Sequence, residues 1–371
     1  MVDVLFKNAS YVAADLGSTI FEIMDGAGGA RIQPGTRVLI KPNLLMPAGP
    51  DRGITTHPLI VKAVVAYVLE KGAKPVVADS PGMGSFEKIL RKGGYLDATS
   101  GMDVLFRPFR DSVSVDIGEP FGAIGLAREA LQSDFVINLA KLKTHAQMLL
   151  TLGVKNMFGC VIGLKKPEWH LKAGTDRAMF ARLLVQICRA VDPDITIVDG
   201  IMALEGQGPG RSGTTRELGL IAGSRNAYAL DMTLCKVLGL DPSELQTHKA
   251  AKELKLLPEN INLSGRFHVL NDFVFPDIGP LTLGPKMLHG FMRRHIIQKP
   301  VVDNNACKLC GECWKYCPVK AITHNIKGIR FNYDACIRCY CCLEICPYGA
   351  IQMKEPLLGK LVRPYIHSSE T

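Results

Sequence analysis

The chain has 371 residues, of which 47% are hydrophobic and 21% are charged, and this composition excludes a disordered or low-complexity protein. At roughly 150 residues per domain, the length predicts two or three domains. There are 44 lysine and arginine residues against 35 aspartate and glutamate residues, a formal net charge of +9. The sequence has no apolar run of the ~18 residues that a transmembrane span needs. Its start lacks the pattern of a signal peptide, so we expect a cytoplasmic, reducing location.

Apolar, β-branched runs alternate with helical patterns along the first 300 residues. This alternation is typical of an α/β fold with a mostly parallel sheet flanked by helices. We expect strands at Thr36–Ile40, Pro75–Ala78, Asp134–Leu139, Ile195–Val198 and Leu218–Ala222, with further candidates at Met102–Phe106 and Ser112–Ile117. We expect helices at His57–Lys71, Phe86–Lys92, Arg177–Val191 and Ala227–Leu238.

Polar side chains stand where several of these strands end. In chain order they are Lys41, Asn43, Asp79, Ser80, Lys141, Lys143, His145 and Asp199; the segment from Thr151 to Gly159 adds Lys155 and Asn156, and His57 begins the first helix. In open α/β sheets, ligands bind beyond the carboxyl ends of the strands. Because buried charges are costly without partners, we expect one convergent polar pocket.

Several lysines with few carboxylates suit an anionic ligand, either a carboxylate or a phosphate. We assign charge neutralisation to Lys141, Lys143 and Lys155 and proton transfer to His145, as catalytic residues. The expected substrate-binding residues are Lys41, Asn43, His57, Asp79, Ser80, Asn156 and Asp199, of which His57 also titrates near neutral pH. The alternative is that each is an ordinary surface cap or salt bridge.

Two glycine-rich segments resemble nucleotide-binding motifs only superficially. Residues 208–213 match G-x-G-x-x-G, but the run that follows predicts a strand, whereas the dinucleotide motif requires a helix. We therefore expect a plain loop, whose amides could still hold an anion. Residues 79–84 lack the Gly-Lys-Ser/Thr of a P-loop. No motif for a flavin or nicotinamide is present.

A basic amphipathic stretch separates the two expected parts of the chain. Residues 284–299 place Met287, Leu288, Phe291 and Ile296 on one side. We expect a linker helix packed between domains, and the alternative is a helix that docks on a membrane surface or a partner. The predicted domains are an α/β domain at 1–283, this linker, a cysteine-rich domain at 300–354 and a tail at 355–371.

The C-terminal part contains a repeated cysteine motif. Nine of the twelve cysteines lie between Cys307 and Cys346, in two copies of C-x2-C-x2-C-x3-C-P that begin 29 residues apart. In two-cluster ferredoxins, the first three cysteines of a copy bind one cluster and the fourth binds the other. We assign Cys307, Cys310, Cys313 and Cys346 to one [4Fe-4S] cluster, and Cys336, Cys339, Cys342 and Cys317 to a second.

Structural zinc and disulfides are the alternatives for these cysteines. Zinc sites usually pair two C-x2-C knuckles, or a knuckle with histidines, and disulfides conflict with a reducing compartment. Cys341 is an extra thiol, either a bystander or a residue with a ligand or redox role. Cys160, Cys188 and Cys235 lack the spacing and are expected to be buried as small apolar residues.

Residues 300–354 resemble bacterial two-cluster ferredoxins, which implies a one-electron carrier with Ala321, Ile322, Ala350 and Ile351 as equivalent packing positions. Each oxidised cluster carries a charge of about −2, so two clusters leave only a mildly basic protein. Nucleic-acid binding, which needs a concentrated basic face, is therefore not expected.

Six stretches of the first domain resemble the iron–sulfur proteins of domain-of-unknown-function family 362. They are VLIKPNLL, GITTHP, VVADSPG, INLAKLKTHAQMLLTLGVKNMFGCVIG, IVDGIMALEGQGPGRSG and AYALDMTLCKVLGLDP, and they cover roughly residues 35–245. The resemblance implies this domain, the pocket and a C-terminal ferredoxin module, and it implies no substrate.

The sequence therefore predicts an iron–sulfur electron-transfer protein, a ferredoxin-coupled oxidoreductase acting on an anionic substrate or cofactor in the α/β domain. Its expected partner is a redox protein or a small electron donor. The alternative is a non-enzymatic electron carrier or accessory protein whose α/β domain recognises a redox partner.

Overall fold

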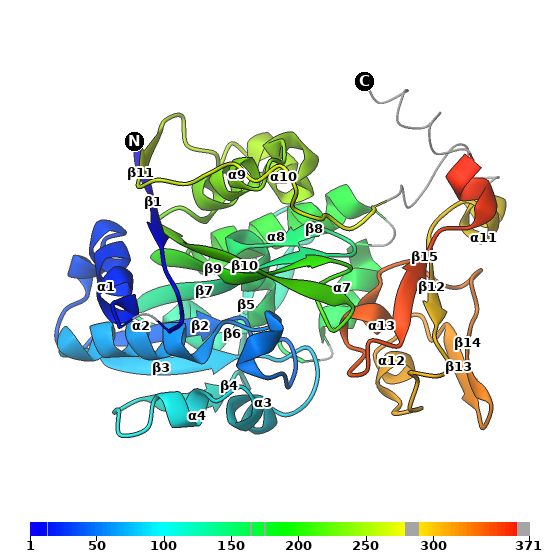
Figure 1. Cartoon of the computed structure of the whole chain (residues 1–371), viewed down its shortest axis with the longest axis horizontal. Helices are drawn as coiled ribbons and strands as arrows, with labels where there is room; N and C mark the ends of the chain where they lie inside the picture. Colours follow the sequence, from blue (N-terminus) through cyan, green and yellow to red (C-terminus); the bar gives the residue numbers. More distant parts are fainter. Residues whose placement is uncertain (13, 164, 174–175, 279–288, 362–371) are drawn as a thin grey trace.

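The computed structural model describes residues 1–12, 14–163, 165–173, 176–278 and 289–361, and a mixed sheet forms its centre (Figure 1). Within these residues nine strands make up this sheet. In spatial order they are β11 (Ile261–Ser264), β1 (Val2–Asn8), β10 (Gly213–Ser224), β9 (Ile195–Gly206), β7 (Phe135–His145), β2 (Arg37–Pro42), β3 (Lys74–Asp79) and β4 (Leu105–Pro108), and β8 (Leu149–Thr151) pairs with β7.

The sheet is mostly parallel, as the sequence predicts. The pairs β11–β1, β9–β7, β7–β2, β2–β3 and β3–β4 are parallel, and β1–β10, β10–β9 and β7–β8 are antiparallel. Parallel strands are buried on both faces and therefore read as continuous apolar runs. This explains why the runs around β2, β3 and β9 could be identified from the sequence.

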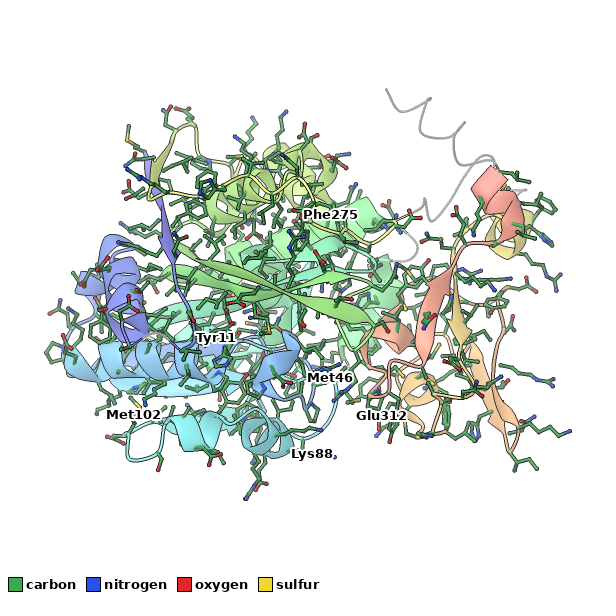
Figure 2. The ribbon with its side chains drawn as sticks, viewed as in Figure 1. Tyr11, Met46, Lys88, Met102, Phe275 and Glu312 are labelled. Atoms are coloured by element: carbon green, nitrogen blue, oxygen red, sulfur yellow. The ribbon has the colours of Figure 1, made fainter. Side chains whose placement is uncertain are left out.

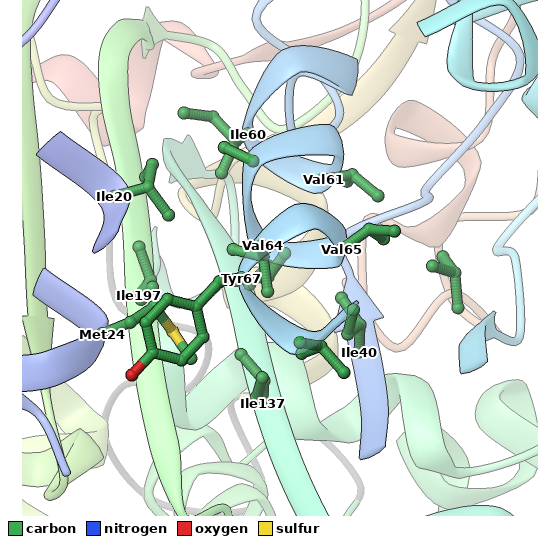
Figure 3. Close-up of a cluster of buried hydrophobic side chains, with 14 of the residues drawn as sticks. Ile20, Met24, Ile40, Ile60, Val61, Val64, Val65, Tyr67, Ile137 and Ile197 are labelled. Carbon is green, nitrogen blue, oxygen red and sulfur yellow. The ribbon is translucent and has the colours of Figure 1, made fainter. Parts of the chain in front are cut away.

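One face of the sheet is covered by α1 (Leu16–Gly26) and α2 (Pro58–Glu70). Pro58 lies in the first turn of α2, and the Nδ1 atom of His57 accepts a hydrogen bond from Leu59 N. Ile60 and Val64 of α2 pack with Ile20 and Met24 of α1 over the sheet residues Ile137 and Ile197 (Figure 3). Nearby stand α3 (Phe86–Lys92) and α4 (Tyr95–Ala98).

The opposite face carries the remaining helices of the large domain. They are α5 (Arg128–Gln132), α6 (Gly153–Asn156), α7 (Lys165–Ala173), α8 (Arg177–Val191), α9 (Ala227–Val237) and α10 (Gln246–Glu253). A separate hairpin joins β5 (Ser112–Asp116) and β6 (Ala123–Ala127). Cys160, Cys188 and Cys235 are buried in these cores, as predicted.

The C-terminal module, residues 299–354, lies beside one end of the sheet (Figure 1). It contains β12 (Lys299–Val302), α12 (Glu312–Lys315), β13 (Ile322–Asn325), β14 (Gly328–Phe331), α13 (Cys341–Glu344) and β15 (Ile351–Lys354). β12 pairs with β15 and β13 with β14, both antiparallel. The packing positions Ala321, Ile322, Ala350 and Ile351 are buried, as expected.

The sequence repeat of the module is also a repeat of backbone conformation. Leu309 and Arg338, Gly311 and Tyr340, and Lys320 and Gly349 all have positive φ, and each pair is 29 residues apart. Positive φ is uncommon outside glycine. The two cysteine loops therefore follow the same unusual backbone path.

The expected linker region is partly visible. Residues 284–288, including Met287 and Leu288, lie outside the described residues, as do 362–371 of the tail. Helix α11 (His289–His295) follows, and Phe291 on it is 56% exposed. Among the parts of the chain that the structure describes, no helix has the length and apolar character to cross a membrane.

Apolar contacts join the C-terminal module to the large domain. Met46, Ile54 and Met83 pack against Ile345 and Tyr316 (Met46 is labelled in Figure 2). Ala146, which follows β7, packs in the apolar core of the module. This junction closes the carboxyl ends of the central strands.

Candidate functional site

A cavity of about 100 Å³ lies between the carboxyl ends of β2, β3 and β7 and the C-terminal module. We call it the polar cavity. Seven of the predicted residues line it, namely Lys41, Asn43, Asp79, Ser80, Lys143, Lys155 and Asn156. Its size suits a small molecule and not a dinucleotide, whose sites are several times larger.

Lys41 and Asp79 form a buried ion pair in the wall of the polar cavity. The Lys41 Nζ atom is 2.9 Å from Asp79 Oδ1, and both side chains are at most 5% exposed. The Asp79 carboxylate also accepts hydrogen bonds from Leu44 N and Ser80 N. A side chain at Gly159 would place its Cβ 2.5 Å from both atoms of the pair. The pair therefore depends on a glycine at this position.

Lys143 reaches the polar cavity from the end of β7. Its Nζ atom donates to Asn43 Oδ1 at 2.9 Å and to the Ile54 carbonyl at 2.5 Å. Both of these partners are neutral, and among the described residues no carboxylate forms an ion pair with this ammonium. Burial lowers the pKa of Lys143 to about 7.

Helix α6 supplies Lys155 and Asn156. The backbone N–H groups of Gly153 and Val154 at its start donate to the two carboxylate oxygens of the buried Asp231, at 2.8 and 3.0 Å. We find no hydrogen-bond or ion-pair partner of the Lys155 ammonium among the described residues. Burial lowers the pKa of Lys155 below its ordinary value. This ammonium is therefore available to a ligand.

The lining residues that were not predicted include Thr151, Lys166, His170, Cys341 and Glu344. Lys166 and His170 are four residues apart on α7, a spacing that puts both on one helix face and was visible in the sequence. The Lys166 Nζ atom donates to Ser80 O at 2.7 Å and Ser80 Oγ at 2.9 Å, and burial lowers its pKa to about 8.

Two neutral polar atoms in the wall lack partners. Thr151 Oγ1 and His170 Nδ1 are buried and make no hydrogen bond with the described residues. Buried polar groups are normally paired, so unpaired ones in a cavity wall point to a ligand or to water. Among the described residues, the wall also carries four lysines and two carboxylates. The polar cavity thus favours an anion.

His145 lies behind the wall and does not line it. Its Nδ1 atom accepts hydrogen bonds from Gln147 N and Met148 N, and its Nε2 atom is 3.6 Å from Glu344 Oε2. Burial lowers the pKa of His145 to about 4, so the ring is neutral at neutral pH. Burial alone would raise the pKa of Glu344, but its contact with His145 and the charge of Lys155 hold it below its ordinary value.

The expectation of one pocket for all strand-end residues is wrong for Lys141, His57 and Asp199. Lys141 Nζ is 2.8 Å from Asp199 Oδ2. Lys141 Nζ also donates to the Tyr11 hydroxyl, which in turn donates to Asp199 Oδ1 (Tyr11 is labelled in Figure 2). The ring of His57 stacks on Tyr11, and its backbone N–H donates to Asp199 Oδ2. Lys41 is in register with Asn138 on β7, three residues before Lys141. Side chains three apart on a regular strand point to opposite faces, which directs Lys141 away from the polar cavity. The register of β7 with β9 shifts between Lys141 and Lys143, so the regular alternation does not extend to Lys143, which lines the cavity.

The glycine-rich residues 208–213 connect β9 to β10, and no helix follows, as predicted. Gly208 N donates to Thr144 Oγ1. A Cβ at Gly210 would lie 2.8 Å from the Glu344 carbonyl. This loop therefore packs at the junction with the C-terminal module.

The residues of the C-terminal module fit two [4Fe-4S] clusters. Cys307, Cys310, Cys313 and Cys346 line one cavity, the first cluster site, and Cys317, Cys336, Cys339 and Cys342 line another, the second cluster site. The N–H groups of Ala321 and Ala350 point at the sulfurs of Cys317 and Cys346, each at 3.3 Å. Such N–H groups stabilise thiolates bound to iron.

Cys341 belongs to two walls. It lines the second cluster site and also the polar cavity. Its side chain is 7% exposed. The extra thiol of the second cysteine motif is therefore the shared boundary between the cluster site and the polar cavity.

Comparison with known proteins matches both parts of the chain. A family model described as a domain of unknown function (DUF362) matches residues 38–236, and a 4Fe-4S dicluster domain matches residues 299–347. The thylakoid-associated protein sll1697 of Synechocystis sp. is 38% identical over 303 residues, which are 79% of this chain and 94% of that protein.

Over shorter stretches, the C-terminal domain is similar in sequence to subunits of two oxidoreductases. Pyruvate synthase subunit PorD of Thermotoga maritima is 39% identical over 61 residues, 16% of this chain and 60% of that subunit. The delta subunit of the NADH-dependent phenylglyoxylate dehydrogenase of Aromatoleum evansii is 36% identical over 72 residues, 19% of this chain and 74% of that subunit.

Proposed function

Because the chain belongs to the DUF362 family and carries a dicluster [4Fe-4S] domain, we propose that it is an oxidoreductase that transfers electrons to a small anion bound in the polar cavity. The observation that carries this proposal is Cys341. It lies in the wall of the second cluster site and in the wall of the polar cavity. A ligand in the polar cavity is therefore one side chain away from a cluster.

The walls of the polar cavity support the anionic character of the ligand. Within the part of the chain that the structure describes, no carboxylate is hydrogen-bonded to Lys143, Lys155 or Lys166, whereas Lys41 is paired with Asp79. Unpaired ammonium groups are costly to bury, and an anion between them removes that cost. Thr151 Oγ1 and His170 Nδ1 would complete the hydrogen bonds of the same ligand.

The chemistry divides between cofactor and protein. Bound [4Fe-4S] clusters supply single electrons. Lys155 neutralises the ligand, and Lys143 and Lys166, with pKa values of about 7 and 8, hold protons that can follow the electrons near neutral pH. His145 orients Glu344 from behind the wall, and we give it a positioning role in place of direct proton transfer.

The location of the protein is also part of the proposal. Thiolate ligands survive in a reducing compartment, which favours the cytoplasm. The related cyanobacterial protein is described as thylakoid-associated, and we therefore expect this chain to lie near the cytoplasmic face of a membrane.

Anion binding by the anaerobically purified full chain tests the proposal. The probes are sulfate, succinate and inorganic phosphate, measured by isothermal titration calorimetry. Because we find no partner of the Lys155 ammonium among the described residues, Lys155→Ala removes a positive charge without breaking a described hydrogen bond, and we expect at least one probe to bind about tenfold more weakly. Lys62→Ala is the matched control, since Lys62 is exposed on α2.

Two outcomes contradict the proposal. If no probe binds the wild-type chain, or if Lys62→Ala weakens binding as much as Lys155→Ala, the polar cavity is not an anion site. The non-enzymatic electron carrier then becomes the better description. Iron and sulfide content, measured on each variant, shows that the cluster sites are intact.

A further inference from the structure

The first cluster site opens on the outside of the C-terminal module. Cys310 lines that site and also an open groove formed by Gly311, Glu312, Trp314, Lys315, Lys320, Ile322, Thr323 and His324. Cys310 is exposed, whereas Cys313 and Cys346 of the same site are buried. Glu312 marks the position of the groove in Figure 2. A molecule in this groove therefore lies against Cys310, one of the residues assigned to the first cluster.

The second cluster site borders the polar cavity instead. Its ligand Cys339 and the adjacent Cys341 are 8% and 7% exposed, and Cys341 also lines the polar cavity. The two cluster sites therefore have different neighbours. One has the open groove, and the other has an enclosed cavity.

The groove is basic and has an aromatic floor. Lys315 and Lys320 in its wall are exposed, and the exposed Lys308 stands beside Cys310. Glu312 is the carboxylate among the described residues of the groove. Trp314 stacks on His324 with ring centroids 4.1 Å apart.

Exposed apolar side chains border the same site. Leu309 is 40% exposed and Tyr348 is 49% exposed, and both line the first cluster site. Protein interfaces combine aromatic and apolar contacts at the centre with a charged, solvated rim. An open surface with this composition is suited to a protein partner.

We propose that this groove is the docking surface of an acidic one-electron carrier protein, so that electrons enter at the first cluster site. The lysines attract a negatively charged partner and orient it with its redox centre toward Cys310. The onward transfer of electrons from the second cluster site to a ligand in the polar cavity rests on the proposed function. The docking surface does not depend on it.

Reduction of the clusters by an acidic [2Fe-2S] ferredoxin tests the docking surface. The full chain with both clusters is mixed with the reduced ferredoxin in a stopped-flow instrument, at low and high ionic strength, with no ligand for the polar cavity. The double variant Lys315→Glu/Lys320→Glu is expected to slow the second-order reduction roughly tenfold or more at low ionic strength. The reduction rate of the wild type should decrease as the salt concentration rises, and the rate of the double variant should not.

The matched control is Lys62→Glu/Lys74→Glu, which changes the net charge equally at exposed positions of the large domain. It should stay within about twofold of the wild type. Reduction by dithionite at high ionic strength, where charge is screened and no protein docking is needed, should be within about twofold in all three proteins. A carbodiimide should also cross-link Lys315 or Lys320 to ferredoxin carboxylates, which is a readout without electron transfer.

The proposal is overturned if ferredoxin reduces the groove variant as fast as the wild type at low salt. It is also overturned if the control variant is reduced as slowly as the groove variant. Cross-links confined to lysines outside the groove would overturn it too. Since these assays contain no ligand for the polar cavity, their outcome is separate from that of the anion-binding experiment.

Discussion

Gly159 occupies a position where a side chain would not fit. It lies against the Lys41–Asp79 ion pair, which has almost no exposure to water. The sequence contained this glycine in the segment V-K-N-x-F-G, and the family resemblance pointed to that segment. The reason for the glycine is a close approach between distant parts of the chain, which no local pattern reveals.

We expect Gly159→Ala to destabilise the protein by about 1–3 kcal/mol, because the added methyl group overlaps a buried ion pair. Chemical denaturation measures the change. The control is Gly17→Ala on α1, where a Cβ meets nothing within 4 Å. Alanine there should be neutral or stabilise the helix by about 0.5–1 kcal/mol. Equal effects at the two positions would contradict the crowding argument.

The lysines of the polar cavity predict a pH dependence of anion binding. Burial lowers the pKa of Lys143 to about 7 and that of Lys166 to about 8, so both lose their charge as the pH rises from 7 to 9 in the free protein. Sulfate, which stays a dianion throughout, should bind most tightly near pH 6.5 and about tenfold or more weakly at pH 9.

Calorimetry in buffers of different ionisation enthalpy gives an independent check. Sulfate binding at pH 8 should take up protons, because the anion favours the charged lysines. Lys143→Met should remove part of this uptake. An affinity that is constant from pH 6.5 to 9 would show that these lysines do not meet the anion.

At the scale of single elements, β7 determines which residues reach the polar cavity. The expected strand ended at Leu139, but the observed strand continues to His145 because it pairs with β9, β2 and β8 on its two sides. Lys141 and Lys143 therefore lie inside a strand and not in a loop after it. The sequence predicted the polar residues, but strand pairing decided where each of them points.

The first turn of helix α6 depends on hydrogen bonds to Asp231. Asp231→Ala leaves the N–H groups of Gly153 and Val154 buried without an acceptor, which should cost about 1–3 kcal/mol for each group. Because α6 carries Lys155, sulfate binding should weaken as well. Asp241→Ala removes an exposed cap at Ser243 and serves as the control. If calorimetry finds sulfate affinity unchanged in Asp231→Ala, α6 does not position Lys155.

At the scale of the whole molecule, the sequence predicted the α/β sheet and the cluster-binding module because both depend on local patterns. Apolar runs identify buried strands, and cysteine spacing identifies cluster loops. Seven of the eleven residues expected in the pocket line the polar cavity. Cys341 and Glu344 were missed because the module closes the cavity by packing that joins segments about 200 residues apart, for which the sequence carries no local signal.

This shared wall has a consequence for the evolution of the protein. A recombination event that replaced the C-terminal module with a ferredoxin lacking a glutamate at the position of Glu344 would preserve the cysteine motif and lose the contact to His145. Descendants of such an event would inherit a working electron carrier beside an incomplete cavity. The large domain and the C-terminal module therefore have to match each other at this wall for the cavity to be complete.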